Sequence, residues 1–296
     1  MKRRQFLGIA AAAPAMAMSI DISSIKSRGP KKVEIAYKSA HAKPNGLQAT
    51  AEGMWQLDES KDHWVSLVNP ATGKVIREFQ AVGSNGPSGL TVDRDDVMWI
   101  NSSDSSQIFA CDHRAGKVLR KYWAPGAGRT YRVKGDAKPA QSPLPAAFPA
   151  PPPASKTGTA KGGRGRGAGL PYGEQPLDVM SGVGGLGGQG LEHRDGLLYS
   201  STMASRRVYV IDPKNWEIQA MWDVPGNRSH GCGWEDDTLW VGDTNLWAFF
   251  RFDIKTGKPI EKIQLTSKDP VIHGVTVHDG RLWYCDVQGY ICNFKL

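Results

Sequence analysis

Two histidines at matching places in the chain are the residues best suited to chemistry. His230 lies in a Ser-His-Gly-Cys run and His273 in an Ile-His-Gly-Val run, and each run leads to a Leu-Trp pair and then an aspartate. Imidazole exchanges protons near neutral pH and is a common metal ligand. Two histidines in one repeat position therefore predict either a shared divalent ion or an acid–base pair that acts on a bound molecule.

The same position can be followed through three further repeats. The residue before the first glycine is polar in every copy, and the set is Asn45, Ser88, Gln189, His230 and His273. One such residue per repeat predicts a polar ring at the mouth of a central channel, where Asn45, Ser88 and Gln189 would help to bind a substrate. The alternative is that the two histidines bond only to neighbouring backbone and have a structural role.

A second aligned set follows the tryptophan of each repeat. Its members are Asp58, Asp243 and Asp286, with Ser102 and Thr202 in the other copies. Asp243 and Asp286 are candidate metal ligands beside the two histidines, or partners that fix the imidazole tautomers. An aspartate at the end of a strand also commonly accepts hydrogen bonds from the N–H groups of the next turn, and this structural role is the alternative.

The tryptophans fall into two groups. One group recurs at a single repeat position, which predicts a core between repeats, and it comprises Trp55, Trp99, Trp240 and Trp283. Trp234 and Trp247 fall outside that pattern and are candidates for lining a substrate pocket.

The elements that must position these residues form a repeat with a period in the forties. The copies open near residues 45, 88, 189, 230 and 273, with a spacing of 43 residues between the first two. Short, β-rich segments at such a period are typical of a β-propeller. In the fourth copy we expect strands near 231–234, 238–241, 248–253 and 260–265. The expected fold class is all-β, a five-bladed β-propeller.

The last repeat has room for only three strands. Residues 33–37, Val-Glu-Ile-Ala-Tyr, supply a β-rich segment at the other end of the chain. We expect this N-terminal strand to pair with residues 290–294 and to close the ring, because closure removes the two unpaired edges of an open array.

One long insertion breaks the repeat between the second and third copies. Residues 125–188 are rich in proline and glycine and contain few strand formers. We expect an irregular, mobile loop, which is either a lid over one end of the propeller or a solvated insertion without a role. Its Arg-Gly run lacks aromatic residues, so we expect no nucleic-acid partner.

The N-terminus resembles a twin-arginine export signal. Lys-Arg-Arg-Gln-Phe-Leu at 2–7 precedes a short alanine-rich stretch, and residues 15–17 fit a cleavage site. The expected organisation is a signal peptide at 1–17 and a single propeller domain at 18–296, located in the periplasm or secreted. The apolar stretch is shorter than the ~20 residues of a spanning helix, so we expect no transmembrane segment after signal removal, and a monomer.

Charge and cysteine content add little to the functional argument. The net charge of +8 includes the basic start and much of the insertion, which leaves a mildly basic surface for anionic partners. The chain has four cysteines and no Cys-x-x-Cys spacing, so small buried side chains are expected rather than a zinc site.

The repeat openings resemble two propeller families. Pro-Ser-Gly-Leu-Thr-Val at 87–92 and Ile-His-Gly-Val-Thr-Val at 272–277 look like repeats of the streptogramin (virginiamycin B) lyases. That resemblance implies histidines at repeat openings, a nearby acid and a bound divalent metal, and Asp243 stands where that family carries a glutamate. Gly-Gln-Gly-Leu-Glu at 188–192 is similar to a blade of the five-bladed glutaminyl cyclotransferases, although Ser200 replaces a family glutamate. The general look of the repeat is shared with the quinoprotein-like propellers.

Together these features predict an exported propeller that acts on a small molecule at its channel mouth. The reaction expected is that of a metal-assisted lyase or hydrolase, with the identity of the divalent metal left open. The alternative is a non-catalytic propeller that binds a ligand or another protein.

Overall fold

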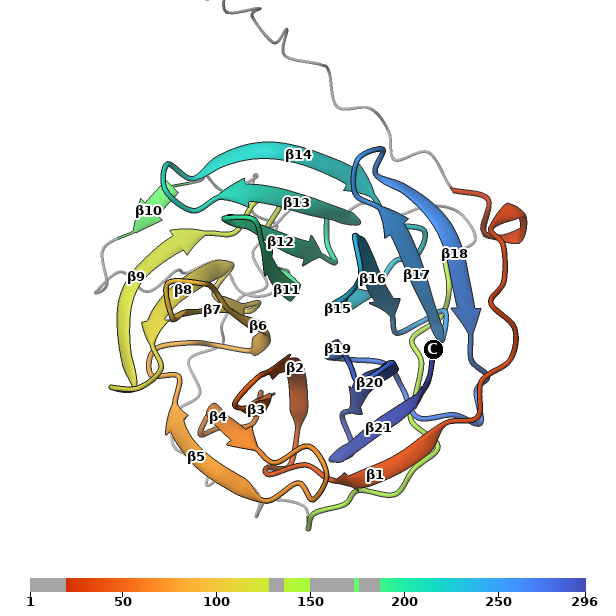
Figure 1. The fold of residues 1–296 in the computed structure, drawn as a ribbon, viewed down its shortest axis with the longest axis horizontal. Helices are drawn as coiled ribbons and strands as arrows, with labels where there is room; N and C mark the ends of the chain where they lie inside the picture. Colours follow the sequence, from red (N-terminus) through yellow and green to blue (C-terminus); the bar gives the residue numbers. More distant parts are fainter. Residues whose placement is uncertain (1–19, 128–135, 150–172, 176–186) are drawn as a thin grey trace, which may run out of the picture.

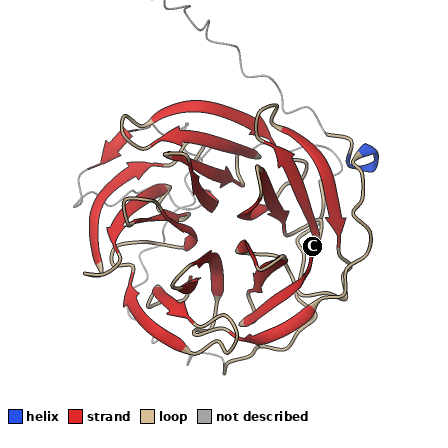
Figure 2. Cartoon of the chain, viewed as in Figure 1, coloured by secondary structure: helices blue, strands red, loops and turns tan. Residues whose placement is uncertain are grey.

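The protein is an all-β ring of five blades. The computed structural model describes residues 20–127, 136–149, 173–175 and 187–296, and Figure 1 shows their five sheets arranged around a common centre. Strands make up nearly all of the regular structure, and the described helix is a single 3-10 turn at Ile22–Ser24 (Figure 2). The predicted five-bladed propeller is confirmed.

Each blade is built of antiparallel strands taken in chain order from the centre outward. Blade one contains β2 (Pro44–Thr50), β3 (Gly53–Asp58), β4 (Trp64–Val68) and β5 (Val75–Gln80). Blade two contains β6 (Pro87–Val92), β7 (Val97–Ser102), β8 (Gln107–Asp112), β9 (Lys117–Trp123) and β10 (Gly173–Gln175). Blade three contains β11 (Gly188–Arg194), β12 (Leu197–Thr202), β13 (Arg207–Asp212) and β14 (Glu217–Asp223). Blade four contains β15 (Ser229–Glu235), β16 (Thr238–Asp243), β17 (Ala248–Asp253) and β18 (Lys258–Gln264).

Blade five is completed by the N-terminal strand. Its inner strands are β19 (Val275–His278), β20 (Arg281–Asp286) and β21 (Tyr290–Lys295), and β1 (Glu34–Lys38) pairs antiparallel with β21. The register places Glu34 opposite Asn293 and Lys38 opposite Tyr290. The expected ring closure is therefore confirmed, and it covers an edge that would otherwise be left unpaired.

The core lies between the blades, because each sheet packs against two neighbours. Middle strands such as β16 and β20 are buried along almost their whole length, so they carry apolar runs on both faces rather than a strict alternation. The repeat tryptophans are part of this core, and Trp55 and Trp240 are fully buried. The four cysteines are buried and unbridged, as expected for small apolar side chains.

The ring has two faces, which we name by their loops. Every inner strand begins at the upper face, which carries connections such as 224–228 and 244–247. The lower face carries turns such as 236–237 and 254–257.

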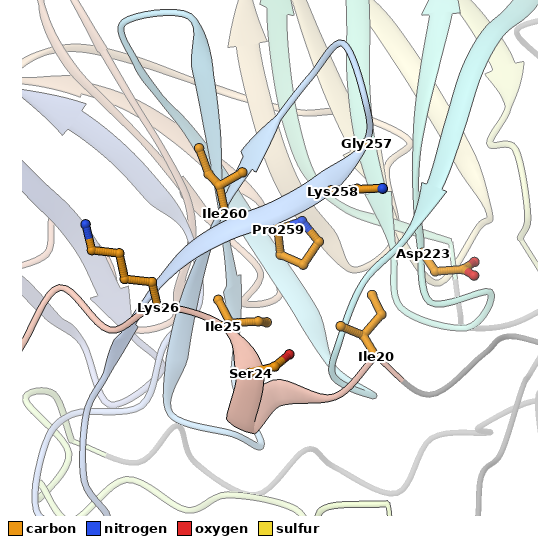
Figure 3. Close-up of a pocket in the computed structure, with 9 residues that line it drawn as sticks. All are labelled: Ile20, Ser24, Ile25, Lys26, Asp223, Gly257, Lys258, Pro259 and Ile260. Carbon is orange, nitrogen blue, oxygen red and sulfur yellow. The ribbon is translucent and has the colours of Figure 1, made fainter.

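Residues 20–33, here called the N-terminal clasp, lie along the outer edge of blade four. Ser27 forms a parallel bridge with Lys262, and the Arg28 N–H donates to the Lys262 carbonyl at 2.9 Å. Figure 3 shows Ile25 of the clasp facing Pro259 and Ile260 of β18.

The insertion has two described parts. Residues 136–149, here called the strap, contain no helix or strand and cross the upper face past blades three, four and five. The other part, β10, pairs with β9 as a fifth strand, which differs from the irregular structure expected throughout 125–188. The exposed edge of β9 offers unpaired backbone groups, and this is the physical reason that a short segment of little β propensity joins it. The rest of the insertion lies outside the described residues.

None of the helices in the described ranges is long and apolar enough to cross a membrane. The signal peptide expected at 1–17 lies outside those ranges.

Candidate functional site

The five aligned polar residues form one ring at the upper mouth of the channel. Four of them are the second residue of an inner strand, and His273 lies two residues before β19. All five are buried, with at most 6% of any residue exposed. Contacts link neighbouring blades around the ring: Ser88 Oγ donates to Gln189 Oε1 at 2.6 Å, and the imidazole centroids of His230 and His273 lie 4.3 Å apart. The structure therefore brings together every member of this set, and its chemical role stays a prediction.

A chain of hydrogen bonds orients His273. The Asn45 amide nitrogen donates to Glu59 Oε2 at 2.8 Å, so the amide oxygen faces His273 Nδ1, also at 2.8 Å. The network thus assigns the imidazole proton to Nδ1 of His273. Its Nε2 is left as a lone-pair acceptor on the side away from Asn45.

His230 is oriented from the opposite side. The Arg228 Nε–H points at His230 Nε2 across 3.4 Å, and a guanidinium can only donate. The proton of the neutral ring then lies on Nδ1, which is buried and has no hydrogen-bond partner among the described residues. A buried donor without an acceptor is uncommon in a folded protein.

Burial and one guanidinium keep both imidazoles neutral. Burial, reinforced by Arg228, lowers the pKa of His273 to about 3. The pKa of His230 falls well below its usual range through burial, the neighbouring His273 and Arg228. Arg228 also opposes the raised pKa of the Glu59 carboxyl, for which burial is the main cause. The charge of Arg228 thus affects the pKa of groups on blades one, four and five, as expected for a side chain that reaches over the mouth.

A ring of five glycines lies just below this mouth. The residue after each ring member is a glycine in every blade, and a Cβ added to any of them would collide with the backbone of the next blade. On Gly274, for example, it would lie 2.6 Å from the Cα of Gly46. The glycines therefore allow the inner strands of neighbouring blades to approach closely around the channel.

The two candidate acidic ligands are occupied by loop backbone. Asp243 accepts hydrogen bonds from the N–H groups of Arg228 and Leu246, and Asp286 accepts from those of Val271 and Gln288. Neither carboxylate is hydrogen-bonded to a histidine. Both aspartates therefore have the turn-stabilising role that is common at the end of a strand.

The two candidate pocket tryptophans lie elsewhere. Trp234 packs edge-on against Tyr199, near the lower end of β15, with Arg194 stacked over it at 4.7 Å. Trp247 packs into the core beside blade five, and its Nε1 donates to the Asp269 carbonyl. The structure places neither of them against the histidine pair.

The donor set at the mouth is a poor fit for a divalent cation. Across the described ranges, no three His, Cys, Asp or Glu side chains converge on one point. Two imidazoles are present, but one of their nitrogens faces Asn45 and another faces the Arg228 guanidinium, which repels a cation. The expected metal therefore stays an untested prediction, and the residues favour a ligand with negative charge.

Sequence reasoning missed the two charged residues that shape the site. Arg228 lies two positions before His230, and Glu59 directly follows Asp58, but neither falls at an aligned repeat position. The only sequence signal for Arg228 and Glu59 was that a charged residue stands close to a repeat motif.

A second buried polar cluster lies on the lower side of the glycine ring. Glu192 of β11 is hydrogen-bonded with Gln48 and Thr91, and burial raises the pKa of its carboxyl well above the usual range. Gln48 also donates to Thr91 Oγ1 at 2.7 Å. This cluster holds a carboxyl group of raised pKa away from solvent.

Two open surface pockets lie at the rim rather than at the mouth. One, of about 550 Å3, separates the N-terminal clasp from blade four (Figure 3). The other, of about 610 Å3, lies between blades two and three on the lower face.

The fold and the site define a five-bladed β-propeller with a polar, two-histidine ring at one channel mouth. No protein family and no curated protein matches the chain by sequence. Among solved structures it is similar to a glutaminyl cyclase of Myxococcus xanthus, with a TM-score of 0.55 and 11% identity over 90% of this chain and 98% of that one.

Virginiamycin B lyase of Staphylococcus aureus, solved as an inactive variant with quinupristin, matches with a TM-score of 0.45 and 16% identity, over 86% of this chain and 66% of that one. A streptogramin B lyase matches with a TM-score of 0.45 and 15% identity, over 90% and 98% of the two chains. At 11% identity, the likeness to the glutaminyl cyclase is one of fold.

Proposed function

We propose that the protein binds a small molecule with an anionic group at the upper mouth and exchanges a proton with it through the imidazole pair. The observation that carries this proposal is the buried His230–His273 pair beside Arg228, with a donor on His230 that lacks an acceptor among the described residues. A carboxylate or phosphate oxygen would accept a charge-assisted hydrogen bond from the Arg228 guanidinium.

The ligand would also change the basicity of the pair. A base with a pKa of about 3 is weak at neutral pH, because efficient proton transfer needs a pKa near the working pH. Burial is the main cause of the low imidazole pKa, and an anion on Arg228 would neutralise the positive charge that lowers this pKa further. Ligand binding would then raise the basicity of His273 Nε2 when a substrate is present.

Two reaction classes suit such a base. Removal of a proton from carbon begins an elimination, and removal of a proton from water begins a hydrolysis, so a lyase or a hydrolase is the enzyme that we propose. The alternative is a propeller that binds its ligand without reaction. A metal-assisted version requires ligands beyond the two imidazoles, so metal analysis of the purified protein tests it separately.

The proposal is tested by thermal shift with a panel of small carboxylates, phosphate and their neutral amide or ester analogues. Anionic members should stabilise the wild type, and the shift should vanish in Arg228→Gln and in His230→Ala/His273→Ala. Lys74→Gln, an equal charge change at an exposed site on blade one, is the control. Equal shifts in Arg228→Gln and the wild type would overturn the anion site, and turnover without binding-linked proton uptake would overturn the role of the imidazoles.

Export by the twin-arginine route, a periplasmic or secreted location and a monomeric state are further proposals. They rest on the sequence of residues 1–17 and on the covered sheet edge of blade five.

A further inference from the structure

Three aromatic rings at the lower ends of the blade grooves are covered by a stacked arginine. The stacks are Arg77 on Trp55 at 4.8 Å, Arg28 on Trp240 at 5.0 Å and Arg194 on Trp234 at 4.7 Å. Each arginine is held in place by an acid, and these acids are Glu52, Glu235 and Asp237 respectively. In these grooves the chain supplies both the cation and its counter-charge.

The groove between blades two and three is built differently. Trp99 has no stacked cation within the described part of the chain, and its Nε1 donates to Asp93 Oδ2 at 2.7 Å. The pocket of about 610 Å3 opens beside this tryptophan, between the turns of the two blades. Trp99 packs instead against Trp216 and Tyr122 and is only 6% exposed, so what is absent here, among the described residues, is a stacked arginine of the kind found in the other grooves.

Three cations line this pocket, and none of them pairs with an acid among the described residues. Arg94 and Arg120 come from blade two and Lys214 from blade three, and all three are exposed. Their side chains make no hydrogen bond or ion pair with the residues that the structure describes. Two acids also line the pocket, Asp93 and Asp95. Asp93 accepts hydrogen bonds from N–H groups of its own turn and from Trp99.

The floor of the pocket is apolar. Trp99 and Ala110 lie at its base, Leu119 is 39% exposed, and Pro213 contributes a further apolar wall. Burial lowers the pKa of His193 at the edge, so its ring is neutral at pH 7. Apolar walls below a rim of unpaired cations match a molecule with one apolar and one anionic end.

We propose that this pocket binds a small organic anion, with its apolar or ring-shaped body against Trp99 and Leu119 and its anionic group on Arg94, Arg120 and Lys214. The site is separate from the histidine mouth, because its lining lies in the lower-face turns of blades two and three and includes none of the ring residues. Charge-assisted hydrogen bonds from two arginines would hold a carboxylate or a phosphate alike.

The test uses the full-length protein and three probes: phenyl phosphate, inorganic phosphate and phenol. Calorimetry or saturation-transfer NMR should show that phenyl phosphate binds more tightly than either fragment. Arg94→Ala/Arg120→Ala should weaken it roughly tenfold or more, since each charged hydrogen bond contributes about 1.5–3 kcal/mol. Leu119→Glu, which adds a negative charge at an exposed position, should weaken it comparably without touching either arginine.

Two control variants establish that the binding belongs to this pocket. Lys74→Ala/Lys255→Ala removes two exposed charges elsewhere and should leave the affinity unchanged, and so should His273→Ala at the upper mouth. The proposal is overturned if the two double variants lose affinity equally, if phosphate alone binds as well as phenyl phosphate, or if phenyl phosphate does not bind at millimolar concentration.

Discussion

The imidazole pair should make the folding stability of the protein depend on pH, and this dependence can be measured without a substrate. In the folded protein the pKa of His273 is about 3 and that of His230 is also depressed, whereas an unfolded histidine titrates near 6.5. The unfolded state therefore binds more protons between these values, and stability is present above pH 6.5 and lost as the pH falls. Urea unfolding should show a decline approaching about 1.4 kcal/mol per pH unit for each imidazole.

The variant His230→Gln/His273→Gln should make this decline shallower below pH 6.5. Both glutamines keep hydrogen-bonding capacity but cannot titrate. An unchanged slope between pH 6.5 and 5 would show that other groups dominate the acid sensitivity.

Glu192 should change the folding stability with pH in the opposite direction. Its folded pKa is raised well above 4.5, so the carboxyl carries a proton that the unfolded chain releases, and this group loses stability as the pH rises above 4.5. We expect Glu192→Gln to be more stable than the wild type at pH 8, because the amide stays neutral beside Gln48 and Thr91. The gain should disappear at pH 4, and Glu217→Gln on exposed β14 should show neither effect.

At the scale of elements, the N-terminal clasp depends on one arginine. Arg28 bonds to Glu235 at 2.8 and 2.9 Å and to Glu261 at 2.8 Å, and it stacks on Trp240. Burial alone would raise the pKa of Glu235, but the bonds from Arg28 and Arg251 lower it to about 2. Arg28→Ala should therefore cost about 1–3 kcal/mol of unfolding free energy, since it leaves a partly buried acid short of a partner.

The measurement is chemical denaturation at pH 7, with Lys26→Ala as an exposed control in the same clasp. Identical midpoints for the two variants would mean that the clasp is held by its backbone and not by Arg28.

The strap lies beside the candidate site and shields it. Asp136 pairs with Arg206, and the Asn227 amide donates to the Ala137 carbonyl one residue before Arg228. Asn245 accepts from the Ala140 N–H and donates to Asn227. We expect Asp136→Asn/Asn245→Ala to speed hydrogen exchange and proteolysis within 136–149 while the blades stay resistant.

Access of small anions to the mouth should rise in the same variant. An unaltered cleavage rate would show that the strap does not depend on these polar contacts.

Much of the fold, but less of the site, could be predicted from the sequence. The period, the polar ring and the closing strand all follow from local pattern, because a repeat places equivalent residues at equivalent points in space. The contacts that orient the histidines could not be read in this way, since Arg228 and Glu59 lie in loops whose course depends on neighbouring blades. The position of Trp234 depended in turn on a strand register that pattern alone does not specify.

For the whole molecule, ring closure by β1 can be tested with a matched pair of deletions. Removal of residues 20–32 takes away the clasp and keeps β1, whereas removal of 20–38 takes away both. The shorter deletion should remain monodisperse in light scattering, and the longer one should aggregate, because it leaves the β21 edge unpaired. Equal behaviour of the two proteins would argue that β1 is dispensable for closure.

The pairing of β1 with β21 also sets how the ring would respond to mechanical force. Glu34 opens β1 and stands opposite Asn293 near the end of β21, so the outward ends of both strands lie at the same end of the pair. Tension applied through those ends would break the hydrogen bonds between β1 and β21 one after another, as in unzipping. It would not load all of these bonds at once, as shear does. Blade five would be the point of rupture at low load, although β1 and β21 lie at opposite ends of the chain.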